Sequence, residues 1–183
     1  MSRVQQLLDT VGRQSEQVQV EWQAVEAELG TALPADFKEF CEAFGRGEFN
    51  GFLYVYTSKG GTHLEVLDNL RKLRRALESW PDAESVYEPY RIFEPGQGGL
   101  LRWGGAAAEG YAYYWLVTEE APENWPIVAR TDDTEEWHQY EMSVSEFVYR
   151  MITDTEFKPF SCASYSPVPH YESYSDAEPG SLE

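Results

Sequence analysis

Apolar residues in the first quarter of the chain recur with the period of an α-helix. The pattern predicts a helix over residues 2–11, a second over about 21–29 and a third that begins at Pro34 and ends before Gly45. Because the stripes lie on single helical faces, we expect their aromatic members, Trp22, Phe37 and Phe40, to be buried. The stripes consist of Val4, Leu7, Leu8 and Val11; of Trp22, Val25 and Leu29; and of Phe37, Phe40, Cys41 and Phe44.

The pattern then changes to short runs of strand-forming residues. Three of these runs each carry one tryptophan between glycine or proline residues, which suits a curved antiparallel meander with a large apolar face. We therefore expect Trp103 and Trp115 to be buried as well. The predicted strand segments are residues 49–56, 90–93, 98–104, 111–116, 123–128 and 137–140.

Two more helices complete the expected set of elements. One runs from about residue 63 to 80, and its apolar stripe extends to Trp80, directly before Pro81. The other covers about residues 144–152, where Ser143 as N-cap and Glu146 three positions later indicate a capping box.

Length and composition favour one domain. A chain of 183 residues that is 42% hydrophobic is large enough for a single substantial core. We assign it to residues 1–160, with a helical arm at 1–20 and the core at 21–160. Residues 161–183 are rich in Ser, Pro and Tyr with acids but no bases, so they are predicted to be a disordered tail.

Two kinds of segment are missing from the pattern. No apolar run is long enough to cross a bilayer, and the first residues lack the apolar centre of a secretory signal, so we expect a cytoplasmic protein. Cys41 and Cys162 are far apart in sequence, and we expect free thiols in place of a disulfide framework.

Charge adds the second strong clue. The chain carries 32 Asp and Glu against 14 Lys and Arg, a formal charge of −18, which disfavours direct binding of nucleic acid. Residues 119–141 contain eight acids and one base, Arg130, and this stretch is either a solvated surface or a docking surface for a basic protein. Four bases on the 63–80 helix, Arg71, Lys72, Arg74 and Arg75, are either a solvated face with internal pairing or a partner patch.

If the partner is basic, the acids of this stretch are the candidate contacts, with one acid from the turn before the first strand. Trp137 and Tyr140 are the candidate aromatic anchors that an interface needs. The acidic candidates are Glu48, Glu119, Glu120, Glu123, Asp132, Asp133, Glu135 and Glu136.

Candidate catalytic chemistry is sparse. His63, His138 and His170 are the only histidines, none has the spacing of a zinc site, and no metal or other cofactor is expected. The glycines of residues 96–99 lack the Lys-Ser/Thr that completes a phosphate loop and precede a strand. We therefore expect a protein that is not an enzyme and has no catalytic residues.

Two sets of motifs follow one another between about Trp22 and Phe160. The opening set is Trp22, Glu26, Leu29-Gly30, Leu33-Pro34, Asp36-Phe37, Phe40 and Gly47. The second set is residues 98–104, Trp115, residues 125–128 and residues 145–147. In this order the motifs resemble the SMI1/KNR4 family, also called the SUKH superfamily, and the second set is similar to its actinobacterial branch. The turn at residues 106–111 departs from the Asn-Gly-Asp type that the family pattern suggests.

The resemblance implies an α+β fold, with helices packed on a strongly curved, mostly antiparallel sheet. Bacterial members are largely immunity proteins that bind and inhibit a cognate toxin, often a nuclease, and a fungal branch acts in cell-wall regulation through protein contacts. The implied function is neutralisation of a basic toxin domain. The alternative is an intracellular scaffold or regulatory module without a toxin partner.

Overall fold

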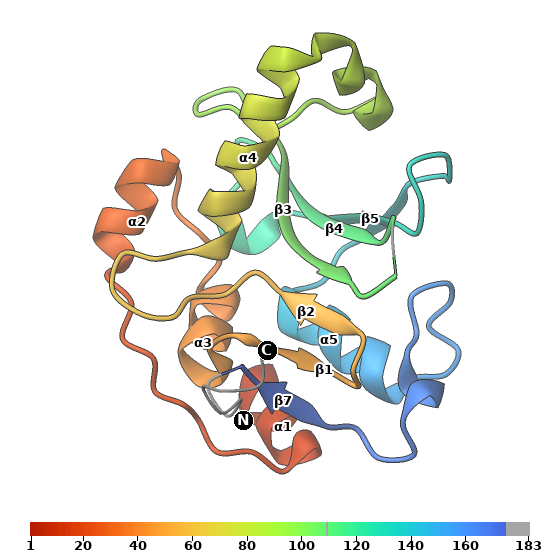
Figure 1. Cartoon of the computed structure of the whole chain (residues 1–183). Helices are drawn as coiled ribbons and strands as arrows, with labels where there is room; N and C mark the ends of the chain where they lie inside the picture. Colours follow the sequence, from red (N-terminus) through yellow and green to blue (C-terminus); the bar gives the residue numbers. More distant parts are fainter. Residues whose placement is uncertain (109, 175–183) are drawn as a thin grey trace, which may run out of the picture.

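A seven-stranded antiparallel sheet forms the centre of the computed structural model, which describes residues 1–108 and 110–174 (Figure 1). Its strands lie in the order β6-β5-β4-β3-β2-β1-β7. The long strand β3 is irregular where its register with β4 shifts between Arg102 and Gly104. The bounds are β1 Gly47–Phe49, β2 Leu53–Val55, β3 Gly99–Ala106, β4 Ala112–Val117, β5 Ile127–Arg130, β6 His138–Tyr140 and β7 Tyr171–Ser173.

Helices cover one face of this sheet, so the α+β architecture implied by the sequence is confirmed. Helices α1, α3 and α5 contact one another, and α4 lies along β3 (Figure 1). Short 3-10 turns occur at η1 Pro81–Tyr87, η2 Pro122–Asn124 and η3 Ala163–Tyr165. The helices are α1 Arg3–Val11, α2 Trp22–Leu29, α3 Ala35–Phe44, α4 Glu65–Ser79 and α5 Val144–Thr153.

Aromatic side chains fill the space between helices and sheet, as the apolar stripes predicted. The ring of Phe37 meets Trp115 edge-on at 4.8 Å, and Trp103 meets Phe147 at 5.6 Å. Phe37, Phe40, Trp103 and Trp115 are all buried, whereas Trp22 is half-buried. Both cysteines are buried free thiols.

The N-cap of α5 has half of the predicted geometry. Ser143 Oγ accepts a hydrogen bond from the backbone N–H of Glu146 at 3.3 Å. The Glu146 carboxylate, however, forms an ion pair with Arg3 of α1 at 2.5 Å. This side chain therefore ties two helices together.

Three predicted elements differ from the structure. Residues 49–56 form a hairpin in place of one strand, because Asn50 and Gly51 adopt positive φ angles of 52° and 62° and reverse the chain. Residues 90–93 form no strand; Ile92 makes only an isolated bridge to Leu100. The stripe of α4 ends before Trp80, whose side chain is 70% exposed.

The predicted disordered tail is wrong for residues 161–174. Strand β7 pairs with β1, and Tyr171 packs between Phe44 and Phe49 at ring distances of 5.0 and 4.7 Å. Gly47 makes this approach possible, since any larger side chain there would collide with Tyr171 and the backbone of Glu172. Asn50 also bonds to the Cys162 carbonyl oxygen and the His170 N–H, so contacts distant in sequence order this polar segment. The remainder of the predicted tail, residues 175–183, lies outside the described residues.

The opposite face of β3, β4 and β5 carries a second, smaller apolar cluster. It consists of Leu100, Ala112, Tyr114 and Val128, and it is covered by Tyr87, Tyr90 and Trp137. The covering residues come from η1, from the segment after it and from the end of the acidic 131–136 loop. In the described part of the chain, no helix combines the length and apolarity needed to cross a bilayer.

Candidate partner-binding surface

The buried side chain of Arg130 holds the acidic 131–136 loop in place. It is the last residue of β5, and its side chain is only 2% exposed. Its guanidinium donates to the carbonyl oxygens of Val86 at 2.7 Å and Asp133 at 3.1 Å. The same group forms an ion pair with the Asp133 carboxylate at 3.2 Å. A single buried cation therefore connects η1 with the acidic loop.

Trp137 lies over this cation and does not project as a free anchor. Its ring centre is 4.0 Å from the Arg130 guanidinium carbon, and its indole N–H donates to the carbonyl oxygen of Glu88 at 3.0 Å. Its ring also meets Tyr90 at 5.5 Å and Tyr114 at 5.8 Å. The half-buried Trp137 thus holds η1 and the acidic loop together.

Tyr140, the second predicted anchor, packs into the main core. Its ring contacts Phe157 at 5.2 Å and Phe147 at 5.4 Å. Burial also raises the pKa of its phenol above the ordinary value. This half-buried ring serves mainly to attach β6 to α5.

The carboxylates of the 131–136 loop are exposed but not all free. Asp132 accepts hydrogen bonds from the Thr134 backbone N–H at 2.9 Å and its hydroxyl at 2.8 Å, and these bonds hold the pKa of Asp132 below its usual value. The Asp133 side chain is 67% exposed even though it pairs with Arg130. Glu135 and Glu136 are exposed. The loop therefore presents negative charge on a backbone that its own side chains fix.

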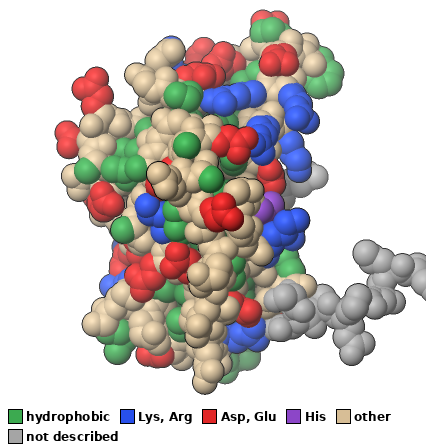
Figure 2. Space-filling view, turned by 90° about the vertical axis from the view of Figure 1, so that its left-hand side faces the viewer, with side chains coloured by type: hydrophobic (Ala, Val, Ile, Leu, Met, Phe, Trp, Pro, Cys, Tyr) green, Lys and Arg blue, Asp and Glu red, His purple; other side chains and the backbone are tan. Residues whose placement is uncertain are grey.

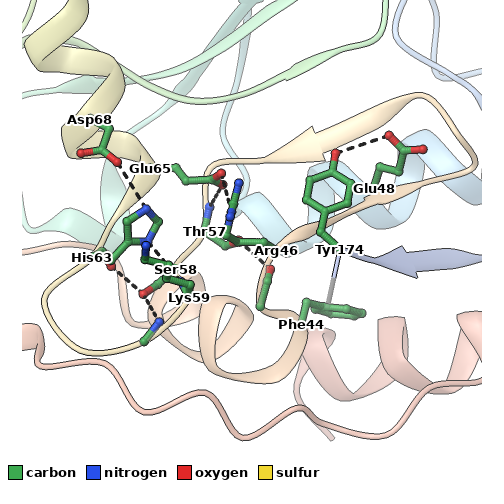
Figure 3. Close-up of polar contacts among 12 residues, drawn as sticks. Phe44, Arg46, Glu48, Thr57, Ser58, Lys59, His63, Glu65, Asp68 and Tyr174 are labelled. Carbon is green, nitrogen blue, oxygen red and sulfur yellow. Dashed lines mark hydrogen bonds and ion pairs between the residues drawn. The ribbon is translucent and has the colours of Figure 1, made fainter. Parts of the chain in front are cut away.

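The structure separates the other predicted contacts from this loop. Glu119, Glu120 and Glu123 lie at the opposite end of the β4–β5 hairpin, and Glu123 accepts a long hydrogen bond of 3.4 Å from the backbone N–H of Ala35. Glu48 lies on β1, four strands away from β5, beside Tyr174 (Figure 3). The ten predicted residues consequently occupy four places, with Tyr140 packed against the main core, and do not form one site.

Charge-pattern reasoning missed a second acidic segment that the fold brings to the loop. Residues Asp82, Glu84 and Glu88 lie in and just after η1, and all three are exposed. Together with Ser85 and Tyr90 they line an open hollow of about 570 Å³. The sequence pattern that could have predicted this segment is the run of three acids, without a Lys or Arg between them, that follows Pro81. We define the joint acidic surface as Asp82, Glu84, Glu88, Asp132, Asp133, Glu135 and Glu136.

Comparison with known protein families supplies the assignment. The family model described as SMI1-KNR4 cell-wall (SUKH_6) matches residues 19–148, which is more than half of the chain. The chain belongs to the SMI1/KNR4 family. No curated protein and no solved structure gives a significant match. The matched region runs from before α2 into α5, so α1 and β7 of this family member lie outside it.

A group of polar side chains at the loop between β2 and α4 brings Ser58, His63 and Asp68 close together in this SMI1/KNR4 protein (Figure 3). The Ser58 hydroxyl donates to the backbone oxygen of His63 at 2.5 Å and not to the imidazole ring. The ring accepts from the Lys59 backbone N–H at 3.1 Å, and its other nitrogen lies 3.3 Å from Asp68. The hydroxyl is therefore not oriented for activation by the histidine. These contacts instead stabilise the conformation of the loop between β2 and α4.

Glu65 completes this loop from the first turn of α4. Its carboxylate accepts hydrogen bonds from Arg46 Nε at 2.9 Å and from the Thr57 backbone N–H at 3.0 Å (Figure 3). Among the residues that the structure describes, no three His, Cys, Asp or Glu side chains are placed to hold a metal ion.

Two of the four predicted basic residues of α4 form ion pairs, and the other two are exposed. Arg71 pairs with Glu28 and with Asp68, and Arg74 donates to the Phe93 carbonyl oxygen at 3.1 Å and reaches Glu94 at 3.4 Å. Lys72 and Arg75 are exposed. Figure 2 shows several Lys and Arg side chains grouped at the upper right of the face drawn, with Asp and Glu side chains beside them.

Proposed function

We propose that this SMI1/KNR4 protein is a non-catalytic binding protein that neutralises a basic toxin domain, with a nuclease as the toxin class. Family membership supports a protein-binding role, because bacterial SMI1/KNR4 domains commonly serve as immunity proteins. A nuclease that grips phosphate backbones is commonly basic, which suits an inhibitor with a formal charge of −18. The protein would act in the cytoplasm, where such a toxin threatens the cell that produces it.

The observation that carries this proposal is the joint acidic surface. Seven exposed carboxylates lie on two segments that are far apart in sequence. Arg130 joins these segments through the carbonyl oxygens of Val86 and Asp133, and Trp137 donates to that of Glu88. A preorganised surface of one charge accelerates encounter with an oppositely charged partner and loses little entropy on binding.

A regulatory or scaffolding role without a toxin is the second candidate function. It is supported by the cell-wall branch that the family description names. Gene neighbourhood separates the two roles, since an immunity gene is expected beside the gene of its toxin and a regulator is not.

The direct test uses the toxin domain that the immunity role predicts to be encoded by an adjacent gene. We expect the two proteins to co-purify and the nuclease activity of the toxin to disappear at an equimolar ratio. A matched control replaces this protein by the variant in which Asp82, Glu84, Glu135 and Glu136 are changed to Lys, which should inhibit poorly. Full nuclease activity with excess wild-type protein would contradict the proposed function.

A further inference from the structure

We propose that Trp80 is the apolar anchor of the docking surface and that it inserts into a basic protein partner. This inference rests on the proposed function and specifies where the partner is held. We define the docking knob as residues 79–88, which comprise the end of α4 and η1. It projects from the top of the molecule in Figure 1.

Trp80 differs from every other tryptophan of the chain in its exposure. The other five are buried or half-buried, whereas the Trp80 side chain is 70% exposed. Val86, on the same knob, is 38% exposed. Exposed large apolar side chains in a monomer commonly mark interaction sites, and tryptophan is enriched among the residues that dominate binding energy.

The backbone that carries Trp80 is held on both sides. Its N–H donates to the carbonyl oxygen of Ala76 at 2.9 Å, and its own carbonyl accepts from the N–H of Ala83 at 3.0 Å. Farther along the knob, Arg130 holds the carbonyl oxygen of Val86 at 2.7 Å, and Tyr87 packs on Tyr114. The indole is thus presented by a fixed turn, which reduces the ordering cost of binding.

Charge on the knob identifies the partner as basic. Asp82, Glu84 and Glu88 follow Trp80 within eight positions, no Lys or Arg lies between them, and all three are exposed. They line the open hollow of about 570 Å³ next to Pro81, and Glu84 also borders a second hollow with Arg74 and Arg91. An exposed indole followed in the chain by exposed acids is complementary to a basic surface that carries an apolar pocket.

Selection from a phage-displayed library of random dodecapeptides tests this surface without knowledge of the natural partner. Wild-type protein, Trp80→Ala and the control Tyr165→Ala serve as baits; Tyr165 is exposed on η3, which lies at the lower end of the molecule in Figure 1. We expect wild type and the control to enrich peptides that combine Lys or Arg with apolar residues. Trp80→Ala should bind the selected peptides about tenfold or more weakly.

The outcomes separate the anchor from the function. Equal binding by Trp80→Ala, selected peptides without basic residues, or no enrichment would overturn the proposed anchor. The same three proteins are then tested against the neighbouring toxin domain. Inhibition by wild type and Trp80→Ala alike leaves the proposed function in place and overturns the anchor. Peptide binding that depends on Trp80, without toxin inhibition, supports the anchor and contradicts the function.

Discussion

The guanidinium carbon of Arg130 lies 4.0 Å from the ring centre of Trp137, so that a buried cation and an indole together fasten two acidic segments to the sheet. The arginine also supplies the donors for the carbonyl oxygens of Val86 and Asp133. The Nε atom of Arg130 is buried without a hydrogen-bond partner, so one of the hydrogen-bond donors of the guanidinium is not satisfied. One buried positive charge, that of Arg130, thus orders the two acidic segments that lie over it.

Removal of this cation should destabilise the protein. Arg130→Ala leaves the carbonyl oxygens of Val86 and Asp133 without this donor and removes the cation–π contact of a buried side chain, so we expect the free energy of unfolding to fall by about 2 to 4 kcal/mol. Urea denaturation followed by tryptophan fluorescence measures this change. The control Arg75→Ala, an exposed arginine of α4, should change stability by less than about 0.5 kcal/mol. A similar effect of both variants would show that Arg130 is not structural.

Replacement of a buried tryptophan should destabilise the protein, whereas replacement of an exposed one should not. Trp103→Ala removes a ring that is completely buried between Tyr113 and Phe147, and we expect a loss of about 3 to 5 kcal/mol. Trp80→Ala changes an exposed side chain and should leave the thermal midpoint nearly unchanged. Differential scanning calorimetry compares them. Equal melting temperatures for Trp103→Ala and wild type would contradict the core described here.

Strand β7 should be necessary for full stability. A chain that ends at Ser166 loses Tyr171, whose hydroxyl donates to the carbonyl oxygen of Phe44 at 3.0 Å and whose ring fills the space beside Phe49. We expect the free energy of unfolding to decrease by about 2 to 4 kcal/mol. A chain that ends at Tyr174 keeps all of these contacts and is the matched control. The strand contributes nothing if both chains melt at the wild-type temperature.

Reversal of charge on the joint acidic surface should act on association. Changing Asp82, Glu84, Glu135 and Glu136 to Lys leaves the Arg130–Asp133 pair intact, and exposed charges contribute little to folding. Stopped-flow mixing with the toxin domain should show association slowed about tenfold at low salt and a flatter salt dependence. Reversal of Glu119, Glu120 and Glu123, at the other end of the hairpin, is the control. Equal slowing by both sets would mean that net charge alone is responsible.

His63 should make the protein less stable in mild acid. Desolvation lowers its pKa below the ordinary 6.5 even though Asp68 and Glu65 favour the charged form. Because the unfolded chain then binds the proton more tightly, the contribution of His63 is present above pH 6.5 and is lost as the pH falls through the lowered pKa. The difference in unfolding free energy between wild type and His63→Gln, measured from pH 8 to pH 5, isolates it from the carboxylates. No change in this difference across the window would contradict the lowered pKa.

Local patterns of apolar and polar residues were sufficient to predict most of the helices and strands and most of the buried core residues. Helical spacing of apolar residues located all five α-helices to within a few positions, and glycine-bounded tryptophan runs located the central strands. Such periodicity is readable locally because each element must bury one face. The same approach failed at Trp80, because an apolar residue at the end of a stripe extends past the edge of the sheet that the helix covers.

Contacts between segments distant in sequence, by contrast, set which charged residues share a surface and which polar segments are ordered. The acids of η1 and those of the 131–136 loop are more than forty positions apart in sequence, and they meet because Arg130 reaches the carbonyl oxygen of Val86 from β5. Conversely, Glu48 and Glu123 are separated from them by the strand order and by the two ends of one hairpin. Residues 161–174 have the composition of a tail but are ordered by long-range contacts, among them the pairing of β7 with the strand that contains Gly47 and the bonds of Asn50 to Cys162 and His170. Long-range pairing depends on register and on the space left by other side chains, and neither is encoded in the local pattern of apolar and polar positions.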